Sequence, residues 1–291
     1  MVNASVIIIS KNEAENLKMT VDSLLGTRNN SSMEIIVVDD GSKDNSSDFL
    51  HAPSYMDRVT LIKTPGLGTS NARNLGASYA NGPILFFCDS HVVVPDYWLD
   101  RMLAALNLLH ADILSPAVAS LYQPEAIGYG LAMDDDGNIY WLNTKPSTPC
   151  MIPFACSCFM AIKKQVFESL GGFDRNYVIY GSEDAELSLR AWLLGYQIVV
   201  YPELVVKHLF KESYSYDFDD SHMNYNLLRM ACTHFNASRL CKILNRVNAE
   251  PHMKEVVESV LSSGVWSQRN KYQKLRVHDD DWFFSTFNMS F

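Results

Sequence analysis

The sequence predicts an α/β fold, in which a parallel β-sheet is covered by helices on both faces and is followed by a helical C-terminal extension. Short runs of continuous apolar residues alternate with segments of helical periodicity through the first half of the chain. Strands without polar alternation are typical of parallel sheets that are buried on both faces. The chain has 291 residues, of which 47% are hydrophobic, so it can bury a large core.

The first half of the chain is predicted to contain four buried strands and two helices. The first helix has Leu17, Val21 and Leu24 on one face. The second helix is ended by the sequence Asn-Gly-Pro, which cannot continue a helix. The predicted strands cover residues 5–10, 34–40, 58–64 and 84–89, and the helices cover residues 13–25 and 69–80.

The second half begins with a helical pattern at 99–113, and the sequence from 114 to 150 is irregular, with a hairpin or loop at 133–143. Ser182 is a plausible N-cap for an amphipathic helix. We divide the chain into a main α/β domain, 1–216, and a helical extension, 217–291. The other predicted elements are a strand at 154–162, a helix from 164 that is ended by two glycines, a helix at 182–196 and a strand at 197–208.

Composition excludes several classes of protein. The net charge of −9 argues against a nucleic-acid binder, which would present a basic surface. No stretch approaches the ~20 apolar residues of a membrane-spanning helix, and the N-terminus lacks a basic leader. We therefore expect a cytoplasmic protein with free cysteines and no transmembrane segment. The C-terminal extension, 217–291, has three possible roles: covering a binding cleft, binding a carrier peptide or forming a homodimer.

Acidic residues and a histidine stand where predicted strands end. Asp89 and His91 are two residues apart on an extended segment, so both side chains project to one side and could bind Mn²⁺ or a similar ion. The alternative is a surface Asp that caps a turn beside an incidental His. Asp39 and Asp40 precede Gly41, and such residues are either turn formers or acceptors for a nucleotide base.

Five further residues are candidates for a functional site. Glu183 and Asp184 open a predicted helix, where acids are favoured by the helix dipole but could also act as a base or bind a sugar. His208 ends an apolar strand, and a lone His there is more often a core residue than a ligand. Lys211 and Tyr216 follow it and could hold phosphate oxygens.

Taken in order, these segments resemble a known family. "SVIIISKNEAENLKMTVDSLL", "EIIVVDDGSKD", "GTSNARNLGA" and "FFCDSH" are similar to the donor half of family 2 glycosyltransferases, which have the GT-A (Rossmann-like) nucleotide-sugar transferase fold. "FFCDSHVVV", "LGGFDRNYVIYGSEDAELSLRAWLLGY" and "KHLFKESYSYDF" resemble motifs of the polypeptide N-acetylgalactosaminyltransferases. The resemblance covers roughly residues 4 to 230, and four motifs in the right order are more specific than any one of them.

The resemblance implies a role for each matching residue. Asp89, His91 and His208 would bind Mn²⁺ (or Mg²⁺), which holds both phosphates of a UDP-sugar. Glu183 would bind sugar hydroxyls, and Asp184 would be catalytic with it. The donor-binding set would contain Asp40 at the uracil with Asp39 beside it, Arg73 near the donor, Lys211 and Tyr216 near the diphosphate, and Ser10, Gly68 and Ser90.

The sequence departs from the peptide-transferase pattern at two places. Asp184 replaces the family's Asn, and inverting family 2 enzymes have an Asp there as general base, so an inverting reaction is favoured while a retaining one stays open. Cys156, Ser157 and Cys158 replace Ala-Gly-Gly beside the donor sugar. The larger side chains would narrow that pocket, which favours UDP-glucose or UDP-galactose over an N-acetylated sugar.

The resemblance therefore predicts a metal-dependent glycosyltransferase that moves a hexose from a UDP-sugar to an acceptor, such as a Ser, Thr or Cys side chain of a peptide. A growing polysaccharide or a lipid-linked glycan is an alternative acceptor. A non-catalytic nucleotide-sugar-binding protein is an alternative of another class. A nucleotidyltransferase is disfavoured, because "SKNEAEN" after the first strand is not a Gly-rich phosphate loop. We also predict a flexible lid over UDP at 214–220.

Overall fold

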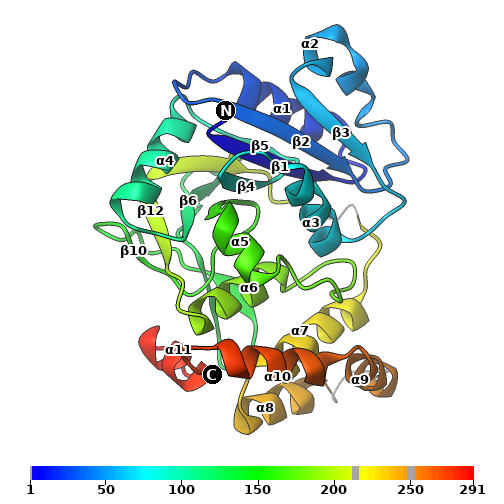
Figure 1. The fold of residues 1–291 in the computed structure, drawn as a ribbon, viewed down its shortest axis with the longest axis vertical. Coiled ribbons are helices and arrows are strands. Elements are labelled where there is room, and N and C mark those ends of the chain that lie inside the picture. Colours follow the sequence, from blue (N-terminus) through cyan, green and yellow to red (C-terminus); the bar gives the residue numbers. More distant parts are fainter. Residues whose placement is uncertain (1, 212–215, 248–252) are drawn as a thin grey trace.

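The fold of this chain, in a computed structural model, is built around one large mixed sheet (Figure 1). The structure describes residues 2–211, 216–247 and 253–291. Within them the sheet contains β1 (Ala4–Ser10), β2 (Met33–Asp39), β3 (Val59–Lys63), β4 (Ile84–Asp89), β5 (Val92–Val93), β6 (Ile113–Ser120), β7 (Ile127–Gly128), β10 (Cys150–Met151), β11 (Phe159–Lys163) and β12 (Ile198–His208), and a separate hairpin contains β8 (Leu131–Met133) and β9 (Ile139–Trp141).

The order of strands across the main sheet is β10-β12-β6-β11-β4-β1-β2-β3, with β5 paired to β12 and β7 to β6. Strands β4, β1, β2 and β3 run parallel, whereas β11 is antiparallel to both of its neighbours. The sheet is therefore mixed and not wholly parallel, which corrects the prediction. The carboxyl ends of β1, β2 and β4 still meet at one edge, as predicted.

Helices cover both faces of the sheet, because successive residues of β1 point to opposite sides. Val6 and Ile8 pack in one hydrophobic cluster with α1 and α4, and Ile7 packs in the other with α5 and α6. Gly76 lets α3 approach β1, since a Cβ there would lie 2.4 Å from Ile7 Cγ2. The helices of this part are α1 (Glu15–Gly26), α2 (Pro53–Met56), α3 (Thr69–Tyr79), α4 (Trp98–Leu108), α5 (Lys164–Leu170) and α6 (Glu183–Leu193), with a 3₁₀ turn at Asp48–His51.

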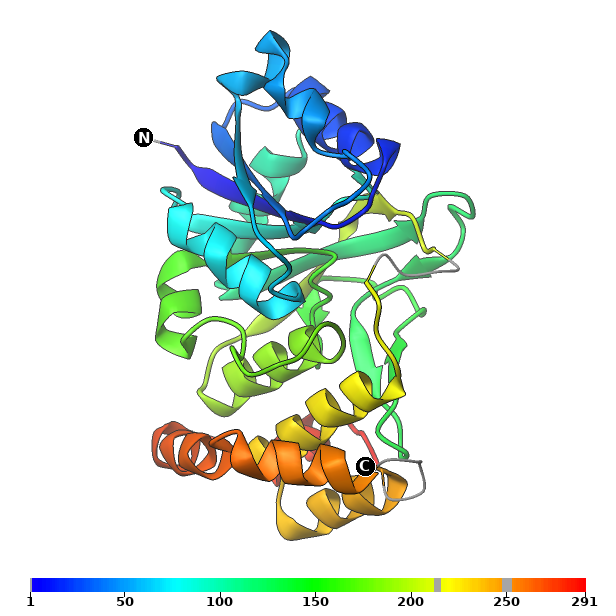
Figure 2. The same cartoon turned by 90° about the vertical axis from the view of Figure 1, so that its right-hand side faces the viewer.

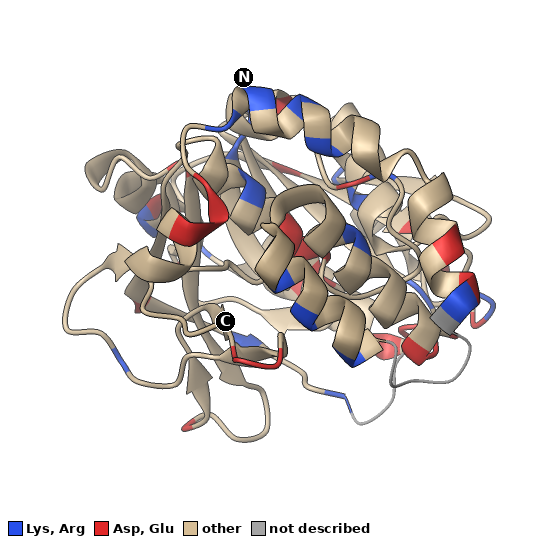
Figure 3. Ribbon diagram, turned by 90° about the horizontal axis from the view of Figure 1, so that it is seen from below, with Lys and Arg blue, Asp and Glu red and all other residues tan. Residues whose placement is uncertain are grey.

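The C-terminal helices form a layer below the sheet domain in both side views (Figures 1 and 2). The cluster that contains Ile7 and Phe87 of the sheet continues through Leu228 and Phe284 of this layer. Lys and Arg as well as Asp and Glu lie on the elements seen from below, so both signs of charge are present there (Figure 3). The helices are α7 (Asp220–His234), α8 (Ala237–Val247), α9 (Met253–Ser262), α10 (Val265–Leu275) and α11 (Asp280–Thr286).

Most predicted elements are confirmed, and the errors lie in the middle of the chain. The segment 114–150 was predicted to be irregular. It contains most of β6, which pairs with β11 and β12 inside the sheet. The predicted strand at 154–162 is shorter, because β11 begins only at Phe159, and Cys156 and Cys158 lie in the turn before it. The hairpin at 133–143 is confirmed as β8–β9. The domain division at 216 stays a prediction.

None of the helices described is both long enough and apolar enough to cross a lipid bilayer.

Candidate functional site

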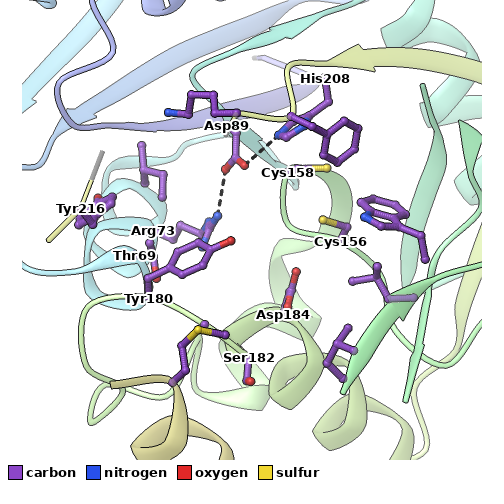
Figure 4. A pocket seen from close by; sticks show the side chains of 18 of the residues that line it. Thr69, Arg73, Asp89, Cys156, Cys158, Tyr180, Ser182, Asp184, His208 and Tyr216 are labelled. Atoms are coloured by element: carbon purple, nitrogen blue, oxygen red, sulfur yellow. Dashed lines mark hydrogen bonds and ion pairs between the residues drawn. The ribbon is translucent and has the colours of Figure 1, made fainter. Parts of the chain in front are cut away.

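A cavity of about 510 Å³ opens at the carboxyl ends of β1, β4 and β12 (Figure 4). Its walls come from the sheet edge, the N-terminal end of α6, the β8–β9 hairpin and the first C-terminal helices. Eight of the predicted site residues line it: Arg73, Asp89, Ser90, His91, Asp184, His208, Lys211 and Tyr216.

Asp89, His91 and His208 converge on one point of the cavity wall. One ligand atom from each lies within 4.8 Å of the other two. His208 Nε2 is 3.4 Å and His91 Nε2 is 4.0 Å from Asp89 Oδ2. The β12–β5 pairing places His208 opposite Val92, one residue after His91, which is how residues 117 positions apart meet. The sequence predicted this group, and it is the one cluster of potential metal ligands among the residues described.

The electrostatics of Asp89 suit cation binding. Burial favours the neutral acid, but the contact with His208 and the charge of Arg73 outweigh it and hold the pKa of Asp89 well below its usual range. Burial lowers the pKa of His208. The carboxylate is therefore charged and that imidazole neutral at pH 7, which are the protonation states of metal ligands. Carboxylate and imidazole donors fit Mn²⁺ or a similar divalent ion.

Arg73 links this cluster to α6. Its guanidinium contacts Asp89 Oδ1 at 3.1 Å and Glu183 Oε1 at 2.9 Å, and its side chain is 4% exposed. The other oxygen of Glu183 accepts a hydrogen bond from Gly181 N at 2.9 Å. Both oxygens of Glu183 therefore have partners within the protein. The side chain is also buried and is not part of the cavity wall. Its predicted contact with sugar hydroxyls stays a prediction.

Asp184 is the carboxylate of α6 that does face the cavity, and it points inward opposite Asp89 (Figure 4). One oxygen accepts from Ser157 N at 3.3 Å and the other from its own helix at Ala185 N. Withdrawal from solvent and the adjacent charge of Glu183 raise the pKa of Asp184 to about 6. A carboxylate with a raised pKa can accept a proton near neutral pH.

The residues predicted for the uracil lie behind the cavity wall. Asp40 is fully buried, and its carboxylate accepts from Thr64 Oγ1, Leu67 N, Gly68 N and Tyr216 OH. Asp39 accepts from Ser42 N and Ser47 Oγ. Both acids therefore shape the loops after β2 and β3, and Tyr216 connects Asp40 to the cavity.

The other donor-binding predictions are divided between cavity and interior. Ser90 lines the cavity, whereas Gly68 and Ser10 do not. Ser10 Oγ is buried without a hydrogen-bond partner in the described part of the chain. The lid predicted at 214–220 begins at residues that lie outside those described. Lys211 donates to Glu13 Oε1 at 2.6 Å.

Two cysteines line the cavity. Cys156 and Cys158 both line it beside Asp184, as Figure 4 shows. The contact with the Cys158 thiol and burial raise the pKa of Cys156 well above its usual value, so it is a neutral, unreactive thiol. Their backbone turn also places Ser157 N against Asp184.

Sequence reasoning missed several residues of the cavity. Trp141 of β9 and Phe210 after β12 meet edge to face, with their ring centroids 5.9 Å apart. Lys11 lies over the ring of Tyr216 at 4.7 Å. Aromatic residues in the irregular region were the available signal for Trp141, but only the fold brings them to the cavity. Glu13, Tyr180, Met223 and Arg246 also line it.

Comparisons with known proteins agree with this geometry. The sequence model of glycosyl transferase family 2 matches residues 5–171, and that of the N-terminal domain of galactosyltransferase matches 144–212. Among curated relatives, the mouse inactive polypeptide N-acetylgalactosaminyltransferase-like protein 5 is 33% identical over 68% of this chain and 51% of its own length. Human polypeptide N-acetylgalactosaminyltransferase 16 is 30% identical over 74% of this chain and 42% of its own. The chain thus spans about half the length of these relatives.

Solved structures share the fold. A crystal structure of GalNAc-T7 with UDP, GalNAc and Mn²⁺ superposes with a TM-score of 0.74 at 21% identity, over 99% of this chain and 57% of that one. A mannosyltransferase from Pyrobaculum calidifontis in complex with GDP-Man and Mn²⁺ has a TM-score of 0.57 at 15% identity, over 94% and 83%. The fold is therefore GT-A, with the C-terminal helices included in the match to GalNAc-T7. Because the family model covers more than half of the sequence, the chain belongs to glycosyl transferase family 2.

Proposed function

We propose that this chain is a metal-dependent glycosyltransferase that moves a hexose from a UDP-sugar to an acceptor. The observation on which this rests is one cavity with a metal-ligand cluster, Asp89, His91 and His208, on one wall and the proton-accepting Asp184 on the opposite wall. Family membership and the GT-A fold support the same class of reaction.

The three ligands would hold Mn²⁺ or Mg²⁺ against the diphosphate of the donor. That GalNAc-T7 was solved with UDP and Mn²⁺, and the mannosyltransferase with GDP-Man and Mn²⁺, supports this choice. When bound, the cation supplies positive charge that stabilises the departing UDP. Lys211 stands next to the cluster and adds a second positive charge on the same side.

Asp184 would act as the general base. In an inverting transfer its carboxylate takes the proton of the acceptor hydroxyl or thiol while the acceptor atom forms a bond to the anomeric carbon. The bond from that carbon to the phosphate oxygen breaks, and its electron pair leaves with UDP. A raised pKa suits Asp184 to this role, and the hydrogen bonds from Ser157 N and Ala185 N hold its oxygens in place.

Cys156 and Cys158 line the cavity, and side chains larger than the Ala-Gly-Gly of the peptide transferases would narrow it, which supports UDP-glucose or UDP-galactose over an N-acetylated donor. For the acceptor we favour a peptide Ser, Thr or Cys side chain, because the similar curated proteins are named polypeptide transferases. A polysaccharide or lipid-linked glycan is the alternative outcome of the same assay.

The test is a panel of UDP-sugars incubated with the protein and Mn²⁺, first alone and then with peptide or glycan acceptors, with products identified by mass spectrometry. We expect UDP-glucose or UDP-galactose to be consumed in a Mn²⁺-dependent way. Release of UDP that is equal with and without Mn²⁺, or equal in a His208→Ala variant, would contradict the proposal.

A non-catalytic nucleotide-sugar-binding protein is the second candidate, because one of the similar proteins is named inactive. Binding of UDP-sugars and Mn²⁺ without turnover of any donor and acceptor in the panel would favour it. The presence of all three predicted metal ligands and of Asp184 at one cavity favours the enzyme.

A further inference from the structure

Glu13 is a buried carboxylate next to the metal-ligand cluster. The sequence predicted no role for it. It is 6% exposed and lines the cavity. Its Oε2 lies 3.2 Å from His91 Nδ1, and its Oε1 accepts a hydrogen bond from Lys211 Nζ at 2.6 Å. One side chain therefore contacts a predicted metal ligand and a predicted phosphate-binding cation at once.

The contact with His91 fixes the state of the imidazole ring. A carboxylate can only accept a hydrogen bond, so Nδ1 of His91 must carry the proton. In the neutral ring Nε2 then has the lone pair, and Nε2 is the atom that faces Asp89. A carboxylate on the far nitrogen of a metal-binding His sets the ring orientation and increases its basicity. Nδ1 of His208, by contrast, has no partner among the described residues.

The loop that contains Glu13 is built to aim it inward. Asn12 and Ala14 on either side have φ of 51° and 47°, which Ala adopts only at a cost. The turn after β2 holds this conformation, because Ser42 Oγ accepts from Asn12 N and Asp44 Oδ2 accepts from Ala14 N.

We propose that Glu13 is a positioning residue for the metal site, which fixes the tautomer and orientation of His91 and keeps Lys211 beside the position of the diphosphate. The proposal rests on the proposed function, since it assumes that the cluster binds a divalent cation. Glu13 itself touches neither the metal nor the substrate in this role, and its effect passes through His91.

The test measures Mn²⁺ affinity without nucleotide, from the EPR signal of free Mn²⁺, in the wild type and in Glu13→Ala, Glu13→Gln and Glu34→Ala variants. Loss of an outer carboxylate typically weakens metal binding roughly 10- to 100-fold, which is the loss expected for Glu13→Ala. Glu13→Gln keeps the size of the side chain and should show a smaller loss. Glu34, a hydrogen-bonded carboxylate at the opposite end of β2, is the matched control and should leave the affinity unchanged.

A second readout does not depend on metal. Long-range ¹H–¹⁵N spectra of the metal-free wild type at alkaline pH should show His91 protonated at Nδ1, and Glu13→Ala should shift the ring toward a mixture of tautomers.

If the wild type binds no Mn²⁺, the metal site and this inference both fail. If the wild type binds Mn²⁺ and both Glu13 variants bind it equally well, only the role of Glu13 is overturned. A loss of the same size in Lys211→Ala would also overturn it, because the effect would then run through the lysine.

Discussion

At the scale of single residues, the proposed transfer step depends most on Asp184, which would be its general base. Asp184→Asn keeps the shape of the side chain but removes the proton acceptor, and its single amide oxygen can accept only one of the two backbone hydrogen bonds, from Ser157 N or Ala185 N. We expect transfer to the acceptor to fall about 10²- to 10⁴-fold, with the affinity for UDP and Mn²⁺ retained. Steady-state kinetics together with calorimetric titration of UDP separate the two effects. An unchanged kcat would remove Asp184 from the mechanism.

The raised pKa of Asp184 also predicts a pH profile. The carboxylate accepts a proton only when ionised, so kcat/KM at saturating Mn²⁺ should fall as the pH decreases through about 6. The stability of the protein depends on pH in the opposite direction. The folded protein holds the proton of Asp184 more tightly than the unfolded chain does, because its pKa is raised on folding. The stabilisation that this proton provides is therefore present below the unfolded pKa and is lost as the pH rises through about 6. Asp184→Asn should therefore stabilise the protein at alkaline pH, as measured by urea unfolding.

At the scale of elements, Arg73 joins α3, β4 and α6. Removing the guanidinium in Arg73→Ala leaves the buried carboxylate of Glu183 and the half-buried carboxylate of Asp89 without their common partner. Breaking a buried ion pair in this way costs about 3–5 kcal/mol of unfolding free energy. Arg28, whose side chain is 75% exposed beside Asp96, is the matched control, and Arg28→Ala should leave stability nearly unchanged. Similar denaturation midpoints for the two variants would contradict this account of Arg73.

The sequence predicted the elements that follow a single strong pattern. The strands β1, β2 and β4 are continuous apolar runs, so their ends, and the acids Asp39 and Asp89 that follow, could be placed in advance. The strand β6 was missed because its sequence, "ILSPAVAS", has a Pro and small residues in place of branched apolar ones. Only its position between β11 and β12 makes it a strand.

Site residues could be predicted where they match a family motif in the sequence. The three metal ligands and Asp184 were found in this way. Residues could not be predicted where only tertiary contacts bring them to the site. Glu13 could not be, because an acid before a helix is an ordinary helix-start residue until the fold brings His91 and Lys211 to it. The burial of Glu183 behind Arg73 likewise depends on contacts that are 110 residues apart in the chain.

At the scale of the whole molecule, the sheet domain and the C-terminal helices share one core. Phe87 of β4 and Leu228 of α7 belong to the same hydrophobic cluster, and Arg229 of α7 binds Asp174 before α6 at 2.8 Å. We expect a single unfolding transition by calorimetry, in which the calorimetric and van't Hoff enthalpies agree. Two resolved transitions would show that residues 217–291 fold as an independent unit.

The proposed transfer reaction depends on a divalent cation bound at the end of β4. The most direct measurement is a crystal structure of the chain grown with UDP and Mn²⁺, with anomalous diffraction recorded at the manganese absorption edge. We predict one manganese peak bonded to Asp89, Nε2 of His91 and Nε2 of His208, with the diphosphate of UDP on its open side. Density for UDP in the cavity with no manganese at these three side chains, or with the metal bound elsewhere, would contradict the account.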